Sequence, residues 1–235
     1  MAAILLYFSH RDGMIGNVEA SEFILERLFE SPQKVRILRL FMQNPDMRFS
    51  VAEASQRSAT ASRTVRAEIK KLVSIGLVTE RMALVNNGGV NGDEVEGLVT
   101  HRNKKQRTPK GPFYAVNKSF PLLVELHALV TKSFLPSRKR LRREVQKIGK
   151  IKLAVLSGLF IDRDKSRTDM FLVGDNIEKR RLHNFFSRIE SELGRSVKYT
   201  TMDTTEFKYR MDMYDRFIRD VLEYPHEKLI NKLNV

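Results

Sequence analysis

The sequence predicts a mixed α+β fold in two parts, and three patterns in the chain support this prediction. Short segments with apolar residues at helical spacing and recognisable capping residues fill residues 31–75. Two short apolar segments, 77–82 and 113–116, flank a long polar stretch, which predicts a β-hairpin with an enlarged tip. Strand-like and helix-like segments then alternate after residue 150, a pattern typical of a small α/β domain.

The first part begins with three helices whose ends are marked by particular residues. Ser31 caps the first helix, and Pro32 occupies its first turn, where the missing N–H costs nothing. Ser50 and Glu53 have the spacing of a capping box and start the second helix. Gly76 is the expected stop of the third. The predicted helices cover residues 32–44, 51–57 and 61–75.

The rest of the chain shows two further helices and then the alternating region. An apolar helix is predicted at 121–134 and a strongly basic one at 136–149. Gly194 follows an amphipathic segment as a C-terminal stop. The alternating region is expected to form strands at 152–157, 168–173 and 197–201, a loop at 158–167, and helices at 177–193 and 205–222.

Composition narrows the classes of function. The net charge is +14, and nearly all of the excess lies between residues 31 and 150, which points to a polyanionic partner. The chain has no cysteine, which excludes disulfides and Cys-ligated zinc. No apolar run approaches the ~20 residues of a membrane span, and the first apolar run is too short for a signal peptide. We therefore expect a cytoplasmic protein without a membrane partner, with residues 1–30 as a leader or arm.

Three short helices followed by a two-stranded wing are typical of a winged helix-turn-helix domain that binds DNA. In this motif the second helix of the pair lies in the major groove, and here that helix is 61–75. Arginine pairs with guanine, hydroxyl groups bond phosphate or base, and the helix N-terminus attracts a phosphate. The residues predicted to contact DNA on this helix are Thr60, Ser62, Arg63, Thr64, Arg66 and Lys70.

The wing loop, 85–112, and the basic helix, 136–149, carry further cations. In the loop, Arg102, Lys104, Lys105, Arg107 and Lys110 are predicted to follow the phosphate backbone or enter the minor groove. The alternative is a basic loop that makes no specific contact. The basic helix is interpreted mainly as an exposed connection between domains, and alternatively as a longer DNA footprint. Aromatic anchors for a membrane surface are absent from it.

Several segments also resemble a known family. They are Lys-Val-Arg-Ile-Leu-Arg-Leu-Phe within 32–78, Ser-Arg-Thr-Asp-Met-Phe-Leu-Val-Gly-Asp at 166–175, Leu-Gly-Arg-Ser-Val-Lys-Tyr at 193–199, and Phe-Ile-Arg-Asp-Val-Leu at 217–222. Residues 32–78 resemble ArsR-like bacterial winged-helix transcriptional regulators, in particular those fused to a minimal nucleotidyltransferase domain. The C-terminal third resembles that second domain.

This resemblance implies a two-metal phosphoryl-transfer site, which needs a Gly-Ser turn and three aspartates as Mg²⁺ ligands. Gly158-Leu159 stands in place of Gly-Ser, Arg167 and Lys198 stand where the first and third aspartates belong, and only Asp169 remains. Because cations repel Mg²⁺, we expect an inactive domain without metal or cofactor. With Ser166 these residues form a degenerate pocket for a nucleotide, unless the domain instead dimerises or contacts a protein.

The leading hypothesis is a transcriptional regulator that binds double-stranded DNA as a homodimer. Its predicted parts are a leader, 1–30, a winged helix-turn-helix domain, 31–135, a basic connecting helix, 136–150, and a nucleotidyltransferase-like domain, 151–235. One alternative is an active minimal nucleotidyltransferase that modifies a protein or RNA, as an antitoxin does. Another is a basic RNA-binding protein.

Overall fold

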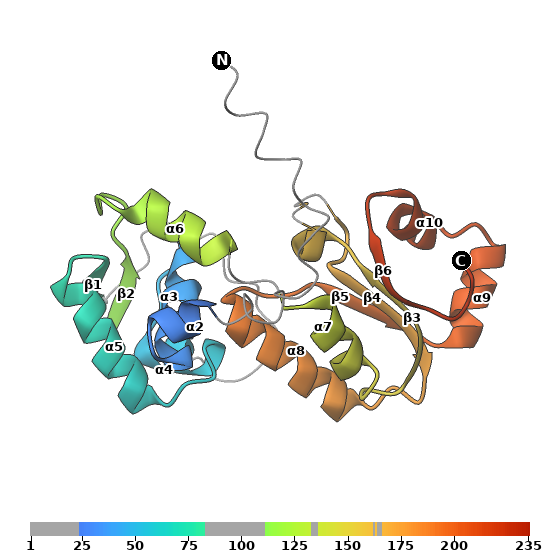
Figure 1. The fold of residues 1–235 in the computed structure, drawn as a ribbon, viewed down its shortest axis with the longest axis horizontal. Helices are drawn as coiled ribbons and strands as arrows, with labels where there is room; N and C mark the ends of the chain where they lie inside the picture. The colour runs from blue at the N-terminus through green and yellow to red at the C-terminus, as the bar shows by residue number, and fades with distance from the viewer. Residues whose placement is uncertain (1–23, 83–110, 133–135, 162, 164–165) are drawn as a thin grey trace, which may run out of the picture.

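The computed structural model describes residues 24–82, 111–132, 136–161, 163 and 166–235 and has the mixed α+β fold that the sequence predicts. Two units lie side by side, each around its own hydrophobic core (Figure 1). The N-terminal unit contains α2 (Ile24–Leu28), α3 (Pro32–Met42), α4 (Val51–Arg57), α5 (Ser62–Ser74), β1 (Val78–Met82), β2 (Pro112–Val116) and α6 (Leu123–Lys132). The C-terminal unit contains α7 (Arg138–Val145), β3 (Lys150–Leu156), the short 3-10 helix η2 (Gly158–Ile161), β4 (Met170–Asp175), α8 (Lys179–Leu193), β5 (Tyr199–Met202), α9 (Thr204–Asp212), α10 (Arg216–Glu223) and β6 (Glu227–Asn231).

In the N-terminal unit, α3 lies at the centre and is buried along most of its length. Ser31 caps this helix, and the capping box of Ser50 and Glu53 starts α4, as the sequence predicts. Phe41 of α3 packs edge-to-face on Phe49, with ring centroids 5.6 Å apart. The strands β1 and β2 pair antiparallel beside α5 and complete this core.

The C-terminal unit has three layers, with a four-stranded sheet in the middle. The strand order is β5-β4-β3-β6, in which β4 and β5 are parallel and the other pairs are antiparallel. Alternate residues of the central strands enter different cores. Leu156 and Leu172 pack with α7 and α8, whereas Val155 and Phe171 pack with α9 and α10. The sheet is therefore buried on both faces.

Helix α7 corrects the prediction of an exposed connecting helix over 136–150. Its apolar side chains, Leu141 and Val145, are fully buried in the core of the C-terminal unit. The helix is also shorter than predicted, because the chain turns after Val145 and enters β3 at Lys150. The basic segment is thus an integral layer of the second unit.

The last third of the chain differs from the prediction in two further places. The single helix expected over 205–222 is two helices, because Tyr214 adopts a left-handed conformation with φ 52° and Asp215 caps a new helix. The strand β6, which the sequence analysis missed, adds to β3 antiparallel. Among the residues that the structure describes, no helix combines the length and the apolar character needed to cross a membrane.

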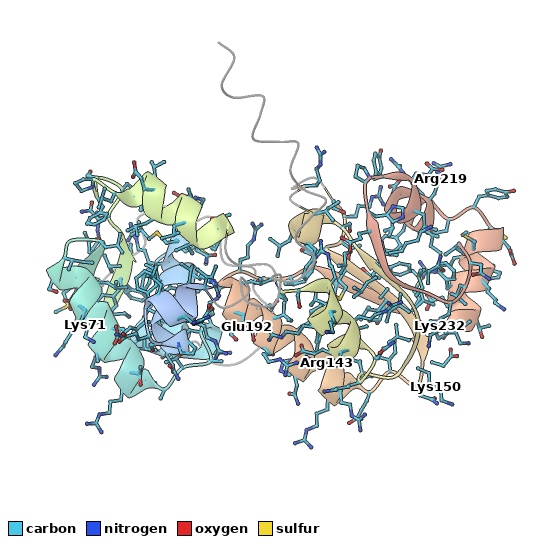
Figure 2. All side chains as sticks on the ribbon, in the orientation of Figure 1. Lys71, Arg143, Lys150, Glu192, Arg219 and Lys232 are labelled. Carbon is cyan, nitrogen blue, oxygen red and sulfur yellow. The ribbon has the colours of Figure 1, made fainter. Side chains whose placement is uncertain are left out.

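Two side chains of the N-terminal unit, Arg39 and Asn44, fasten the two units together at the C-terminal end of α8. Arg39 of α3 is almost completely buried, forms an ion pair of 2.8 Å with Glu26, and donates to the Glu192 carbonyl. Burial lowers the pKa of Arg39, and the charge of Glu26 opposes this shift. Asn44 donates to the carbonyls of Leu40 and Gly194, so one amide bridges both units. Glu192 lies at this junction (Figure 2).

Candidate nucleic-acid interface

Helix α5 has one face in the core and one basic face in solvent. Val65 and Ile69 are buried and fix the helix against the rest of the N-terminal unit. The predicted residues Arg63, Arg66 and Lys70 are all exposed. None of these three has a carboxylate partner among the described residues, so their charges are available to an external anion.

Among the described residues, no side chain caps the start of α5. The helices α3 and α4 have serine N-caps, whereas the N-cap of α5 is Ala61, which makes no side-chain cap hydrogen bond. The first N–H groups of a helix have no intrahelical partner. They leave a partial positive charge at the exposed end of α5, next to Arg63, where a phosphate is favoured.

The hydroxyl residues near this helix end differ in their surroundings. Thr60 is buried, and its hydroxyl donates to the Ser58 carbonyl, so we withdraw it from the predicted interface. Ser62 is exposed and its hydroxyl donates to that of Ser55, while Thr64 is half-buried. Ser62 and Thr64 therefore remain at the edge of the basic face. The five predicted cations of the wing loop, Arg102, Lys104, Lys105, Arg107 and Lys110, lie outside the described residues.

In the C-terminal unit, two of the predicted pocket residues, Gly158 and Ser166, lie beside Asp169. One carboxylate oxygen accepts from the Leu159 amide and the other from the Lys198 amide, both at 2.8 Å. Gly158 has φ 51°, and a Cβ there would lie 2.2 Å from the Asp169 carboxylate and 3.2 Å from Ser166. Asp169 therefore ties the turn after β3 to the start of β5.

The side chains of Arg167 and Lys198, the two cations of this predicted pocket, do not form an ion pair with Asp169. The Arg167 side chain pairs with Asp220 of α10 at 2.9 Å. Lys198 contributes backbone groups to Asp169 and has an exposed side chain. Within the described part of the chain, no three His, Asp or Glu side chains lie close enough to hold a metal ion.

A cleft of about 360 Å³ opens between the two units, next to the residues that fasten them. Its walls come from α3, α4, α8 and the turn that follows α8. The lining includes Arg57, His183, Ser187, Glu190 and Arg195. Sequence reasoning missed this cleft because its residues are far apart in the chain and no spacing links them.

The arrangement offers one basic helix face, one structural carboxylate and one polar cleft between units. No family model, curated protein or solved structure matches the chain.

Proposed function

We propose that the chain is a transcriptional regulator whose N-terminal unit is a winged helix-turn-helix that binds duplex DNA through α5. One observation carries the proposal: Arg63, Arg66 and Lys70 are exposed, without carboxylate partners among the described residues, on a helix whose opposite face is held in the core. A rigid helix of this kind suits the major groove, where arginine reads guanine. The uncapped start of α5 adds a place for a backbone phosphate.

The partner can be tested with labelled nucleic acids and the full chain. Recovery of genomic fragments on the purified protein supplies a candidate site, and fluorescence anisotropy then compares that duplex with a scrambled duplex and with RNA of the same sequence. We expect the selected duplex to bind most tightly, with an affinity that falls steeply as salt rises. Equal or tighter binding to the RNA would instead favour an RNA-binding protein.

We further infer that the C-terminal unit is nucleotidyltransferase-like and catalytically inactive. The strand order β5-β4-β3-β6, with α8 between the parallel strands β4 and β5, supports the resemblance. The inactivity rests on Asp169, whose two oxygens each accept a backbone amide, and on Arg167, which stands where a metal-binding aspartate is expected. Two-metal transfer needs several convergent carboxylates.

Incubation with labelled nucleoside triphosphates and Mg²⁺ tests this inference, because we expect no label on the protein or on added RNA. A label that disappears in an Asp169→Ala variant of unchanged fold would overturn it. Circular dichroism of the variant checks the fold, since Asp169 holds two backbone segments together.

The same proposal includes a homodimer, and we assign its interface to α6. Leu122 and Val124 beside and within this helix are 57% and 76% exposed, which is unusual for a pair of neighbouring aliphatic side chains. Burying them against a second copy would give a symmetric pair with two α5 helices, the arrangement in which dimeric helix-turn-helix proteins bind two half-sites. Light scattering should give a dimer for the natural chain and a monomer for Val124→Glu.

A further inference from the structure

The cleft between the two units is rich in groups that donate hydrogen bonds. Arg57 lies at the end of α4, Arg195 follows α8, and His183 and Ser187 lie on the exposed side of α8. Glu190 is the one carboxylate of the lining, and its Oε1 accepts from the Val197 amide at 2.8 Å. The described lining thus offers two guanidinium groups and one carboxylate, of which Oε1 is engaged by the Val197 amide.

The two cleft arginines differ from the other arginines near this junction. Arg39 pairs with Glu26, Arg140 with Glu192, and Arg188 with Glu144, each at 2.7–2.8 Å. Neither Arg57 nor Arg195 forms an ion pair with any described residue. Arg57 instead has its guanidinium carbon 5.4 Å from the centre of the Phe49 ring, and its Nη1 donates to the Met47 sulfur at 3.8 Å. These contacts orient the side chain and leave its Nε and Nη2 without an acceptor among the described residues.

The walls of the cleft are held in place by the contacts that fasten the units. The carbonyls at the C-terminal end of α8 would repel an anion, but those of Glu192 and Gly194 accept from Arg39 and Asn44. Gly194 lies so close to α3 that an added Cβ would be 2.6 Å from the Arg39 backbone. The cleft is therefore formed before a ligand arrives, which lowers the entropic cost of binding.

We propose that this cleft binds the phosphate group of a small phosphorylated molecule. Arg57 would hold the phosphate from the N-terminal unit and Arg195 from the C-terminal unit, while Ser187 donates to a remaining oxygen. Arginine presents a planar fork of donors that fits phosphate oxygens. A volume of about 360 Å³ leaves room for a sugar as well as the phosphate.

The site also suggests how such a ligand acts on DNA binding, a consequence that rests on the function proposed above. Arg57 is the last residue of α4, and the chain turns from there into α5. The contacts of Arg39 and Asn44 already hold α3 against the end of α8, and a ligand held by both Arg57 and Arg195 adds a connection between α4 and α8 that further restricts the orientation of α5. The binding free energy of the ligand is then coupled to the position of the DNA-reading helix.

Calorimetry on the full chain without DNA tests the site independently of DNA binding. The probes are inorganic phosphate, ribose 5-phosphate and adenosine 5′-monophosphate, with ribose and adenosine as ligands that lack the phosphate. Each phosphorylated probe should bind, each unphosphorylated one should not, and the tighter of the two phosphorylated organic probes distinguishes a sugar phosphate from a nucleotide. Failure of all three phosphorylated probes would overturn the proposal.

Variants assign the binding to the cleft. Arg57→Gln and Arg195→Gln should each weaken the best probe about tenfold or more, since each removes charge-assisted hydrogen bonds. Arg180→Gln is the matched control, because Arg180 is an exposed arginine of α8 that does not line the cleft. If all three variants weaken binding equally, or if none of them does, the probe does not bind in this cleft. Unchanged melting temperatures show that the variants are folded.

Discussion

Helices α5 and α7 are both rich in cations, but α7 uses two of its arginines to contact other elements of the C-terminal unit, while its Arg142 and Arg143 are exposed. In α7, Arg138 pairs with Glu227 of β6, and Arg140 pairs with Glu192 of α8. In α5, Lys71 pairs with Glu68, while Arg63, Arg66 and Lys70 have no carboxylate partner among the described residues. A count of cations along the chain therefore does not identify a nucleic-acid surface. The positions of the nearest carboxylates in the fold separate the cations that are paired from those that face solvent.

The largest effect is expected at Gly194, where the end of α8 meets α3 and the two units touch. Gly194→Ala should lower the free energy of unfolding by about 2–5 kcal/mol, because φ is 74° and the new Cβ would meet the α3 backbone. Gly76→Ala is the control: φ is 78° but no atom lies within 4 Å, so only the backbone strain remains. Urea denaturation followed by circular dichroism measures both, and equal losses would mean that the units are not in close contact at Gly194.

The second largest effect is expected when a paired arginine is removed from α7. Arg140→Ala should cost about 2–3 kcal/mol of unfolding free energy, because it leaves the mostly buried Glu192 carboxylate without this partner, while Glu144 keeps its ion pair with Arg188. Arg142→Ala, on the exposed side of the same helix, should change stability by less than about 0.5 kcal/mol. A similar small effect for Arg140→Ala would show that α7 is not held by its ion pairs.

In α5 we expect the reverse, namely a loss of DNA affinity with little change in stability. Arg63→Ala and Arg66→Ala should each weaken a specific duplex by about 1–3 kcal/mol and leave the unfolding free energy within about 0.5 kcal/mol. Lys71→Ala, whose side chain is engaged by Glu68, is the control on the same helix and should weaken DNA binding less. Anisotropy titrations give the affinities. If Lys71→Ala has the largest effect, the basic face has been assigned wrongly.

The smallest effect concerns an ion pair at the far end of the sheet, between Lys152 and Asp175. The hydrogen bond from Lys152, followed by those from Thr204, lowers the pKa of Asp175 to about 2. Asp175 therefore stabilises the fold above its unfolded pKa of about 4, and this contribution is lost as the pH falls from about 4 to about 2. Carboxyl NMR titration should give a higher midpoint in Lys152→Met, and an unchanged midpoint would exclude Lys152 as the main cause.

Local signals in the sequence predicted much of the fold. The caps Ser31 and Ser50 and the left-handed Gly194 act on neighbouring residues, so their spacing is enough to place helix ends. The left-handed conformation of Tyr214 interrupts the helix that was predicted over 205–222. The sequence did not reveal this break, because such a conformation is rare for tyrosine and no residue pattern marks it. The docking of α7 depends on partners about 50 to 90 residues away, which periodicity does not reveal.

Some features of the candidate site could also be predicted from the sequence, and others could not. The exposed face of α5 follows from helical spacing around Val65 and Ile69, and its cations were predicted correctly as solvent-facing. The burial of Thr60 could not be read from its neighbours, because it depends on the turn between α4 and α5 closing on itself. The two bonds of Asp169 join segments 10 and 29 residues away, so only the folded chain shows that its carboxylate is structural.

The placement of β6 has a consequence for how the chain folds during synthesis. Strand β3 enters the sheet early in the C-terminal unit, but one of its two neighbours is β6, residues 227–231. Until those residues leave the ribosome, β3 has an open hydrogen-bonding edge, and such edges invite pairing with other chains. The N-terminal unit can form earlier from local contacts, so translation leaves the finished α5 attached to an incomplete sheet. The C-terminal unit is then the aggregation-prone part of the nascent chain.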